Sequence, residues 1–196
     1  MSARRRFSDA LLLAAAFGAL AVMRASTPNY TRLIAPIDTH GVRGELVRGR
    51  SLALRVDGVE VARRLRVRAP GGVRELDSGG IWLVVHATAQ AVARPERVAG
   101  AAIVGADGRR YAHSDRAGFA RALLAAQELQ AGVPVRGDLV FELPQAVLAD
   151  AHLVASAHPL DLAPLDSRLD IALGLDAETL AAALSAARDV YDLERP

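Results

Sequence analysis

The chain has 196 residues, with 24 basic and 22 acidic side chains and no cysteine. Its pI of about 9.6 is misleading, because four of the arginines precede residue 25 and the remainder carries 20 basic against 21 acidic residues. A nearly neutral, cysteine-free remainder argues against a basic nucleic-acid-binding protein and excludes a disulfide-stabilised fold.

The N-terminus combines three arginines with an apolar run. Arg4–Arg6 precede Ala10–Met23, which contains no charged residue. As a helix these 14 residues are about 21 Å long, whereas a bilayer core needs about 30 Å, or about 20 residues. Extending the run to residues 7–25 supplies the length but includes Asp9 and Arg24.

We interpret residues 1–25 as a signal-anchor that contacts the membrane through residues 7–25. Basic residues before the span predict a cytoplasmic N-terminus and an extracytoplasmic remainder, in a single-pass protein of the cell membrane. The alternative is a secreted protein, released by cleavage after the A-x-A sequence Ala19-Leu-Ala21. The apolar run therefore predicts the side of the membrane on which the rest of the chain works.

Residues 26–43 contain Pro28 and Pro36 and are expected to form a juxtamembrane linker. Strand signals dominate residues 44–174. Asp57-Gly58 predicts a two-residue hairpin turn between strands at 51–56 and 59–61. Asp107-Gly108 predicts a second hairpin, between 100–105 and 109–113. Further strands are expected at residues 81–87, 138–143, 151–156 and 166–173.

Two aromatic side chains are expected to fill the interior of a two-layer structure. Trp82 lies in a central strand that is apolar on both faces. Phe141 alternates with Asp138 and Glu142, and so points inward with Leu139 and Leu143.

A row of charged residues alternates outward along the second predicted strand: Glu60, Arg64, Arg66 and Arg68. We interpret it as a solvated sheet face. The alternative is a surface that binds a partner.

Two segments have helical spacing. Phe119, Leu123 and Ala126 predict a short helix within residues 115–129. Residues 175–196 predict a C-terminal helix that begins at the N-cap Asp176. Its apolar stripe consists of Leu180, Ala183, Leu184, Ala187 and Tyr191.

Roughly seven or eight short strands, with turn signals about every 8–12 residues, predict an all-β, immunoglobulin-like β-sandwich over residues 44–174. An N-terminal transmembrane or signal helix precedes the sandwich, and a short C-terminal helix follows it.

Four segments carry a resemblance to a known family: Gly80–Val85, Asp107–Tyr111, Gly132–Pro144 and Leu165–Ser167. In this order they resemble the telokin-like, immunoglobulin-fold extracellular domains of Gram-positive bacteria, typified by a mycobacterial secreted immunoprotective antigen. The likeness spans about residues 44–173. Arginine as the sole basic residue, with abundant alanine, indicates a high-GC source of actinobacterial type. The resemblance implies an exported sandwich without catalytic residues.

Residues able to carry chemistry do not form a recognisable pattern. The five histidines lack close metal-ligand spacing: His40, His86, His113, His152 and His158. His113-Ser114-Asp115 places triad residue types side by side, but triads gather them from distant segments. Asp161, Asp166 and Asp170 lack the spacing of a calcium loop. We assign no catalytic, cofactor-binding or metal-ligating residue and expect no cofactor.

We therefore expect a non-enzymatic, membrane-tethered module that binds another protein of the cell envelope, and no nucleic acid. Two alternatives stay open. One is a carrier or sensor of a small ligand, bound in a cleft between the sheets near Trp82. The other is an extracytoplasmic hydrolase, which would need His113 beside an acidic residue in a cleft.

Overall fold

The protein is described by a computed structural model covering residues 3–26, 35–69, 72–118, 120, 122–160 and 166–193. It divides into two compact units, Met1–Ala35 and Pro36–Pro196.

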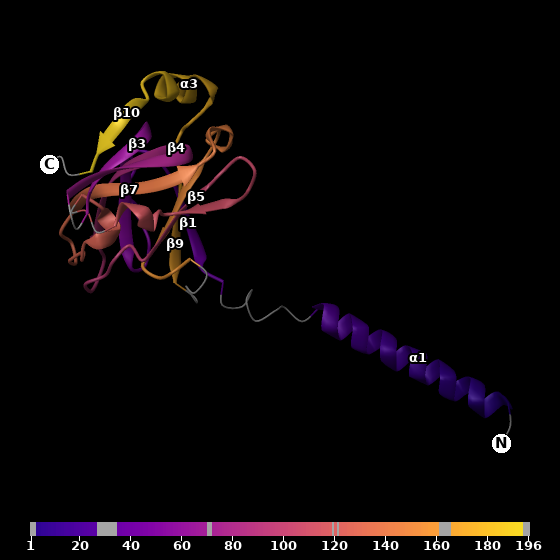
Figure 1. Cartoon of the computed structure of the whole chain (residues 1–196). Coiled ribbons are helices and arrows are strands. Elements are labelled where there is room, and N and C mark those ends of the chain that lie inside the picture. The colour runs from indigo at the N-terminus through magenta and orange to yellow at the C-terminus, as the bar shows by residue number, and fades with distance from the viewer. Residues whose placement is uncertain are drawn as a thin grey trace. The chain divides into compact units, whose positions relative to one another are not determined.

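The first unit contains helix α1, Ala3–Ser26 (Figure 1). Among the described residues, no helix is both long and apolar enough to cross a membrane. The predicted N-terminal helix is confirmed, but the predicted membrane span over residues 7–25 gains no support. The physical reason is that only 14 uncharged residues separate Asp9 from Arg24.

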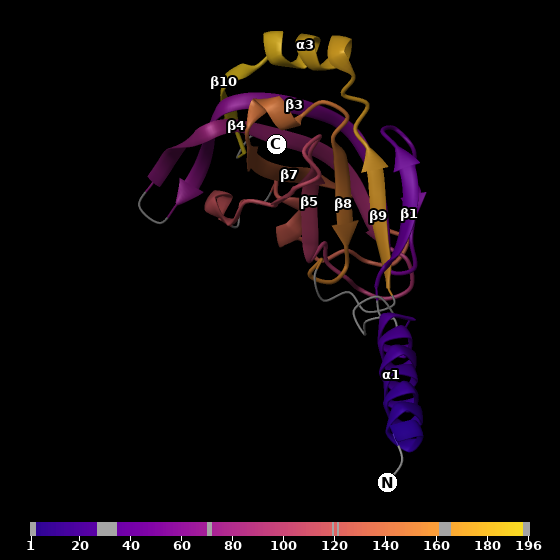
Figure 2. The same cartoon turned by 90° about the vertical axis from the view of Figure 1, so that its right-hand side faces the viewer.

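The second unit is a β-sandwich of two sheets that pack face to face (Figure 2). Antiparallel pairs dominate, while β1–β9 and β10–β3 are parallel. Sheet A has the order β1 (Ile37–Val42), β9 (Ser167–Ala172), β8 (His152–Ser156), β5 (Gly100–Val104), β6 (Arg110–Ala112). Sheet B has the order β10 (Arg188–Asp192), β3 (Leu52–Ala69), β4 (Gly72–Ala91), β7 (Val135–Leu143), with β2 (Val47–Arg48) also paired to β3.

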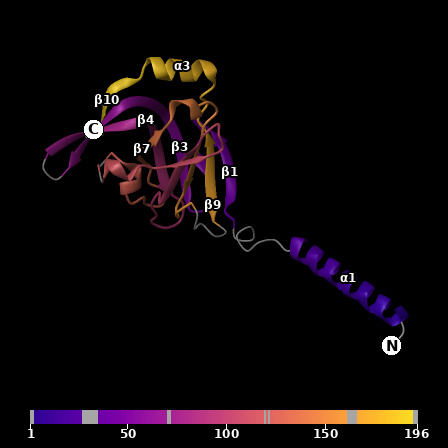
Figure 3. The same ribbon diagram turned by 45° about the vertical axis from the view of Figure 1, so that its right-hand side comes forward.

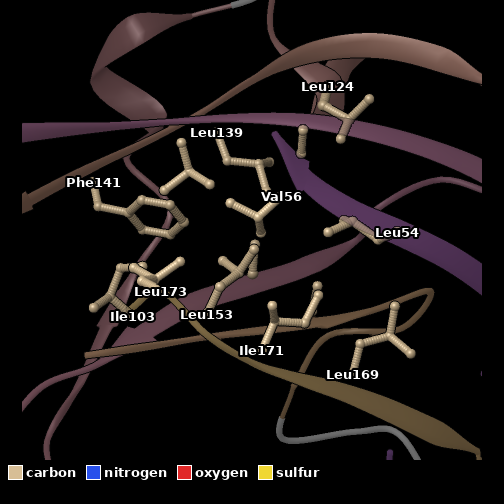
Figure 4. Close-up of a cluster of buried hydrophobic side chains, with 14 of the residues drawn as sticks. Leu54, Val56, Ile103, Leu124, Leu139, Phe141, Leu153, Leu169, Ile171 and Leu173 are labelled. Carbon is tan, nitrogen blue, oxygen red and sulfur yellow. The ribbon is translucent and has the colours of Figure 1, made fainter. Parts of the chain in front are cut away.

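The main core fills the space between the sheets (Figure 4). Alternate residues of each strand point into it, as a pleated strand with one buried face requires. The inward positions predicted for β7 and β9 are confirmed, since these side chains are buried: Leu139, Phe141, Leu143, Leu169, Ile171 and Leu173.

The hairpin predicted at Asp57-Gly58 is wrong. β3 runs without a turn through these residues, and a register shift between Val56 and Gly58 leaves Asp57 as a bulge. Thr88 Oγ1 donates a hydrogen bond of 2.6 Å to the Asp57 carboxylate. Since β4 is a 20-residue strand, pairing β3 along its whole length satisfies more backbone groups than a short hairpin would.

The hairpin predicted at Asp107-Gly108 is confirmed. β5 and β6 pair antiparallel around it, and Gly108 has a φ of 72°, in the left-handed region. Tyr111 Oη donates a hydrogen bond of 2.9 Å to Asp107. The turn forms here as its local sequence predicts, because these residues have no alternative pairing with a longer strand.

Trp82 is fully buried, but not between the sheets. It belongs to a second, smaller hydrophobic cluster with Leu65, Leu76, Val140 and Leu193. Along β4, Trp82 alternates with Leu83, which lies in the main core, so the two side chains point to opposite faces of sheet B. The sequence-based placement of Trp82 in the inter-sheet core is therefore corrected.

The helix predicted within residues 115–129 is also wrong. The segment instead has two short 3₁₀ turns, Asp115–Ala117 and Leu124–Ala126. Leu123 is buried against the second cluster, whereas Phe119 lies outside the described residues. Gly118, with a φ of 66°, ends the first turn.

Both ends of the sandwich unit add strands that the sequence did not predict. Residues 37–42, assigned to the linker, form β1 and pair with β9. The predicted C-terminal helix begins at Asp176 as expected, whose side chain accepts the Thr179 N–H at 2.8 Å. This helix, α3 (Ala177–Ser185), is followed by β10, so Tyr191 is a strand residue and not part of the helical stripe (Figure 3).

Candidate functional site

A polar cluster lies on the outer face of sheet B, where four strands contribute side chains. His86 on β4 contacts Asp138 on β7 through Nδ1 at 2.8 Å and Glu60 on β3 through Nε2 at 3.4 Å. Asp138 is only 9% exposed. Gly58 lies opposite His86 in the β3–β4 ladder.

The C-terminal strand β10 completes this cluster. Tyr191 Oη donates a 2.8 Å hydrogen bond to the other oxygen of Asp138. Arg188 Nε lies 2.7 Å from Glu60, and its guanidinium stacks 5.6 Å from the centre of the Tyr191 ring. Because each carboxylate contacts both His86 and a β10 residue, the cluster joins β3, β4 and β7 to the end of the chain.

The charges of the cluster shift the pKa values of its members. The hydrogen bond to Asp138 and the nearby Glu60 raise the pKa of His86 above its usual 6.5. Burial and the bond to Asp138 raise the pKa of Tyr191, which therefore stays protonated. A protonated His86 between two carboxylates is the arrangement that this site favours.

The pKa of His113, whose backbone forms an isolated bridge with Phe141 on β7, shifts in the opposite direction. Its ring meets Phe141 edge-on at 5.9 Å, and burial lowers the pKa of His113 below 6.5. Its Nε2 atom is buried and has no hydrogen-bond partner in the described part of the chain. The neighbouring Ser114 accepts the N–H of Arg116 and so caps a 3₁₀ turn.

The opposite pKa shifts of these two histidines predict that the protein is most stable near neutral pH. His86 binds a proton more tightly when folded, so its stabilisation is complete below its unfolded pKa of 6.5 and is lost as pH rises through the higher folded value. His113 resists protonation, so its contribution is lost as pH falls below 6.5.

Urea unfolding of the single variants at about pH 5.5, 6.5 and 8.5 tests these two opposite dependences of stability on pH. His86→Gln should lower the free energy of unfolding less at the highest pH than at the middle one. His113→Phe should raise the free energy of unfolding most at the lowest pH. The same difference from the parent protein at all three pH values would contradict the assignment.

The other histidines lie beside carboxylates on sheet A and in its loops. His152 Nδ1 is 2.9 Å and His40 Nδ1 3.4 Å from Asp170, on the outer face of sheet A. His158 Nδ1 is 3.2 Å from Asp166. None of these pairs shares a carboxylate with the His86 cluster.

The aspartates that lack the spacing of a calcium loop can be placed in part. Asp166 accepts hydrogen bonds from the Ser51 hydroxyl at 2.9 Å and from the Ser167 N–H, while Asp161 lies outside the described residues. Within the described ranges, no group of three His, Asp or Glu residues could hold a metal ion.

The arginine row is paired within the protein. Arg64 contacts Glu75 on β4 and Asp189 on β10, and Arg66 contacts Glu75 and Asp192. The interpretation as a purely solvated face is therefore incomplete, since β10 covers part of it. The signal that sequence reasoning missed is the pair of acidic residues Asp189 and Asp192 near β-favouring Val190 and Tyr191, in a segment assigned to the C-terminal helix.

A free strand edge lies at the other side of the molecule. β1 is the last strand of sheet A in the described part of the chain. The Ile37 N–H donates to Asp166 O and the Arg43 N–H to Ala172 O, so the alternate residues Asp38, His40 and Val42 direct their main-chain groups away from β9. Glu45 already occupies the main-chain groups of Val42, because its N–H donates to Val42 O at 3.1 Å and its carboxylate accepts the Val42 N–H at 3.4 Å. Ile37 is 66% and Val42 57% exposed.

The charged side chains of this edge are paired with β9. Arg168 binds Asp38 with two hydrogen bonds of 2.7 and 2.8 Å, and His40 contacts Asp170. Charged side chains on a sheet edge oppose strand addition. Asp38 is the one acidic residue of β1, and Arg168 on β9 neutralises it, so the β1 edge has little of that protection.

No protein-family model matches the chain, and no curated protein matches it. The sandwich is similar to the yjhA protein from Bacillus subtilis, with 14% identity and a TM-score of 0.48, over 67% of this chain and 99% of that one. It is also similar to an uncharacterized β-sandwich protein from Clostridium difficile 630, with 12% identity and a TM-score of 0.43, over 69% of this chain and 95% of that one. Because both TM-scores are low, neither similarity indicates the function of this chain.

Proposed function

We propose that the chain is a non-enzymatic interaction module of the cell envelope, exported by its N-terminal segment, that binds a partner protein by strand addition to β1. The observation that carries the proposal is the exposed β1 edge, where Asp38 and His40 direct main-chain groups away from β9 and the apolar side chains of Ile37 and Val42 are exposed. An extended segment of a partner gains affinity from such main-chain groups and specificity from the side chains beside them.

The finer assignment to the telokin-like, immunoglobulin-fold domains belongs to the same proposal. The segments that resemble this family coincide with β4, with the β5–β6 turn, with β7 and with the start of β9. They are therefore strand and turn elements of the sandwich, as expected of motifs with a structural role. The basic residues Arg4–Arg6 before an apolar run support export, whether the N-terminal segment is retained or cleaved.

The ligand-carrier alternative receives less support than the interaction module. It places a cleft between the sheets near Trp82, but Trp82 lies in the second cluster and has no exposed surface.

A photo-crosslinking residue at Val42, introduced into the full chain in its native cells, tests the proposal. We expect one crosslinked envelope protein of defined mass. The matched control position is Val133, an equally apolar residue that is 53% exposed against 57% for Val42. The same products from both positions, or only pairs of this chain, would contradict an envelope partner at β1.

Two proline substitutions distinguish the outward N–H groups of β1 from the N–H groups that pair with β9. His40→Pro removes an outward N–H and should abolish the Val42 crosslink, at a stability cost of about 1 kcal/mol or less. Thr39→Pro removes an N–H on the β9 side and should cost more than His40→Pro, as loss of a ladder bond does. A crosslink that survives His40→Pro would exclude strand addition.

A further inference from the structure

The C-terminal strand is held almost entirely by its own last residues. In α3 no side chain is fully buried, and Leu180, Ala183 and Leu184 only pack partly against the main core. In contrast, Leu193 is 1% exposed in the Trp82 cluster, and its N–H donates to Arg66 O at 3.0 Å. Residues 188–193 are thus a strand added to the edge of sheet B, at the end of a lightly packed arm (Figure 3).

The β3 edge matches this strand in charge at three residues. Glu60 contacts Arg188, Arg64 contacts Asp189, and Arg66 contacts Asp192. Tyr191 reaches Asp138 across the sheet. Without the strand, Arg64 and Arg66 would share the single carboxylate Glu75, and Glu60 would lose its arginine.

Removing the strand would also uncover apolar surface. Leu193 and Tyr191 pack on the cluster that contains Leu65, Leu76 and Trp82. An open β3 edge would therefore combine unpaired backbone groups, two arginines that share one carboxylate and an apolar surface, which together favour refilling by a strand of the same pattern.

We propose that the β3 edge over Ala62–Arg66 is a strand-acceptor site that takes residues 188–193 of a second copy of this chain in place of its own. The charge order of the edge fits the sequence Arg-Asp-Val-Tyr-Asp-Leu, and every copy carries that sequence. Exchange of the strand repeats the same contacts between two molecules, which is the geometry of a domain-swapped dimer.

Exchange competes with the tethered strand, whose effective concentration is about millimolar for a short linker. The exchanged dimer therefore forms when copies are concentrated, as they are if the proposed envelope location is correct. In this respect the inference rests on the proposed function, although the acceptor site itself does not depend on β1.

The chain offers a matched test. The acceptor is truncated after Ser185, so that its β3 edge is open. The donor is the full chain with Arg64→Asp and Arg66→Asp, whose own edge repels its strand, and with Trp82→Phe to remove its fluorescence. The control donor adds Asp189→Arg and Asp192→Arg, which restores pairing within the donor and mismatches the acceptor.

We expect a 1:1 complex of acceptor and donor by sedimentation, with a blue shift of the acceptor's Trp82 emission. Binding of the control donor should be at least about tenfold weaker, since two ion pairs are replaced by repulsion. If the truncated acceptor does not fold, the full chain with Tyr191→Ser and Leu193→Ser replaces it as acceptor.

No complex at concentrations approaching about 1 mM, or equal binding of the two donors, would overturn the proposal. Binding of a synthetic peptide of residues 186–196 without binding of the donor would also overturn the assignment to a second copy. The Val42 crosslink is measured at the other edge of the sandwich, so failure here is distinguishable from failure of the proposed function.

Discussion

Replacing Phe141 with alanine is expected to lower the free energy of unfolding by about 3–5 kcal/mol. The ring is fully buried between the two sheets, on β7, and it meets His113 edge-on. Truncation leaves a cavity that neighbours such as Leu153 and Ile103, fixed in their own strands, fill only in part (Figure 4).

Urea unfolding followed by far-UV circular dichroism measures this loss. Val133→Ala is the control, because Val133 is 53% exposed and its truncation should stay within about 0.5 kcal/mol. A loss below about 1 kcal/mol for Phe141→Ala would mean that Phe141 is not a packed part of the inter-sheet core.

Replacing Asp138 with alanine is expected to cost about 3 kcal/mol, by breaking a buried charge pair at one partner. Asp138 accepts from Tyr191 and contacts His86, so its removal leaves a half-buried imidazolium facing Glu60 alone and a phenol without its acceptor. We further expect β10 to loosen, because Tyr191 holds it through this carboxylate.

The control is Asp170→Ala, which also removes a carboxylate between histidines. There the side chains of His40 and His152 are 72% and 45% exposed, so the cost should be below about 1 kcal/mol. Hydrogen exchange at residues 188–193 reports on β10 separately. Equal losses for the two variants, or unchanged protection of β10, would contradict the role given to Asp138.

Local patterns predicted those elements that depend on neighbours in sequence. The Asp107-Gly108 turn, the inward faces of β7 and β9, and the Asp176 cap each follow from a few adjacent residues and a fixed periodicity. The Asp57-Gly58 motif has the same local signal, yet it became a bulge because β4 offers β3 a longer partner.

The candidate site could not be predicted in the same way. His86 and Asp138 are 52 residues apart, and Tyr191 is 53 residues further on. Their contact depends on β4 lying between β3 and β7, and on a C-terminal segment pairing parallel to β3. Nor does the composition of residues 37–42 show that they form an edge, because β1 gains its partner from the far end of the sandwich.

The amino-acid sequence alone was enough to predict the β character of residues 44–174, the near-neutral charge after the N-terminal segment and the inward positions of β7 and β9. These properties follow from period-two alternation and composition, which act residue by residue. Three features depend on the three-dimensional arrangement: which strands are edges, the packing of Trp82 outside the inter-sheet core, and the pairing of Arg64 and Arg66 with Glu75, Asp189 and Asp192. The reason is that strand order and long-range pairing depend on which apolar faces can be buried together, and one strand's sequence does not contain that information.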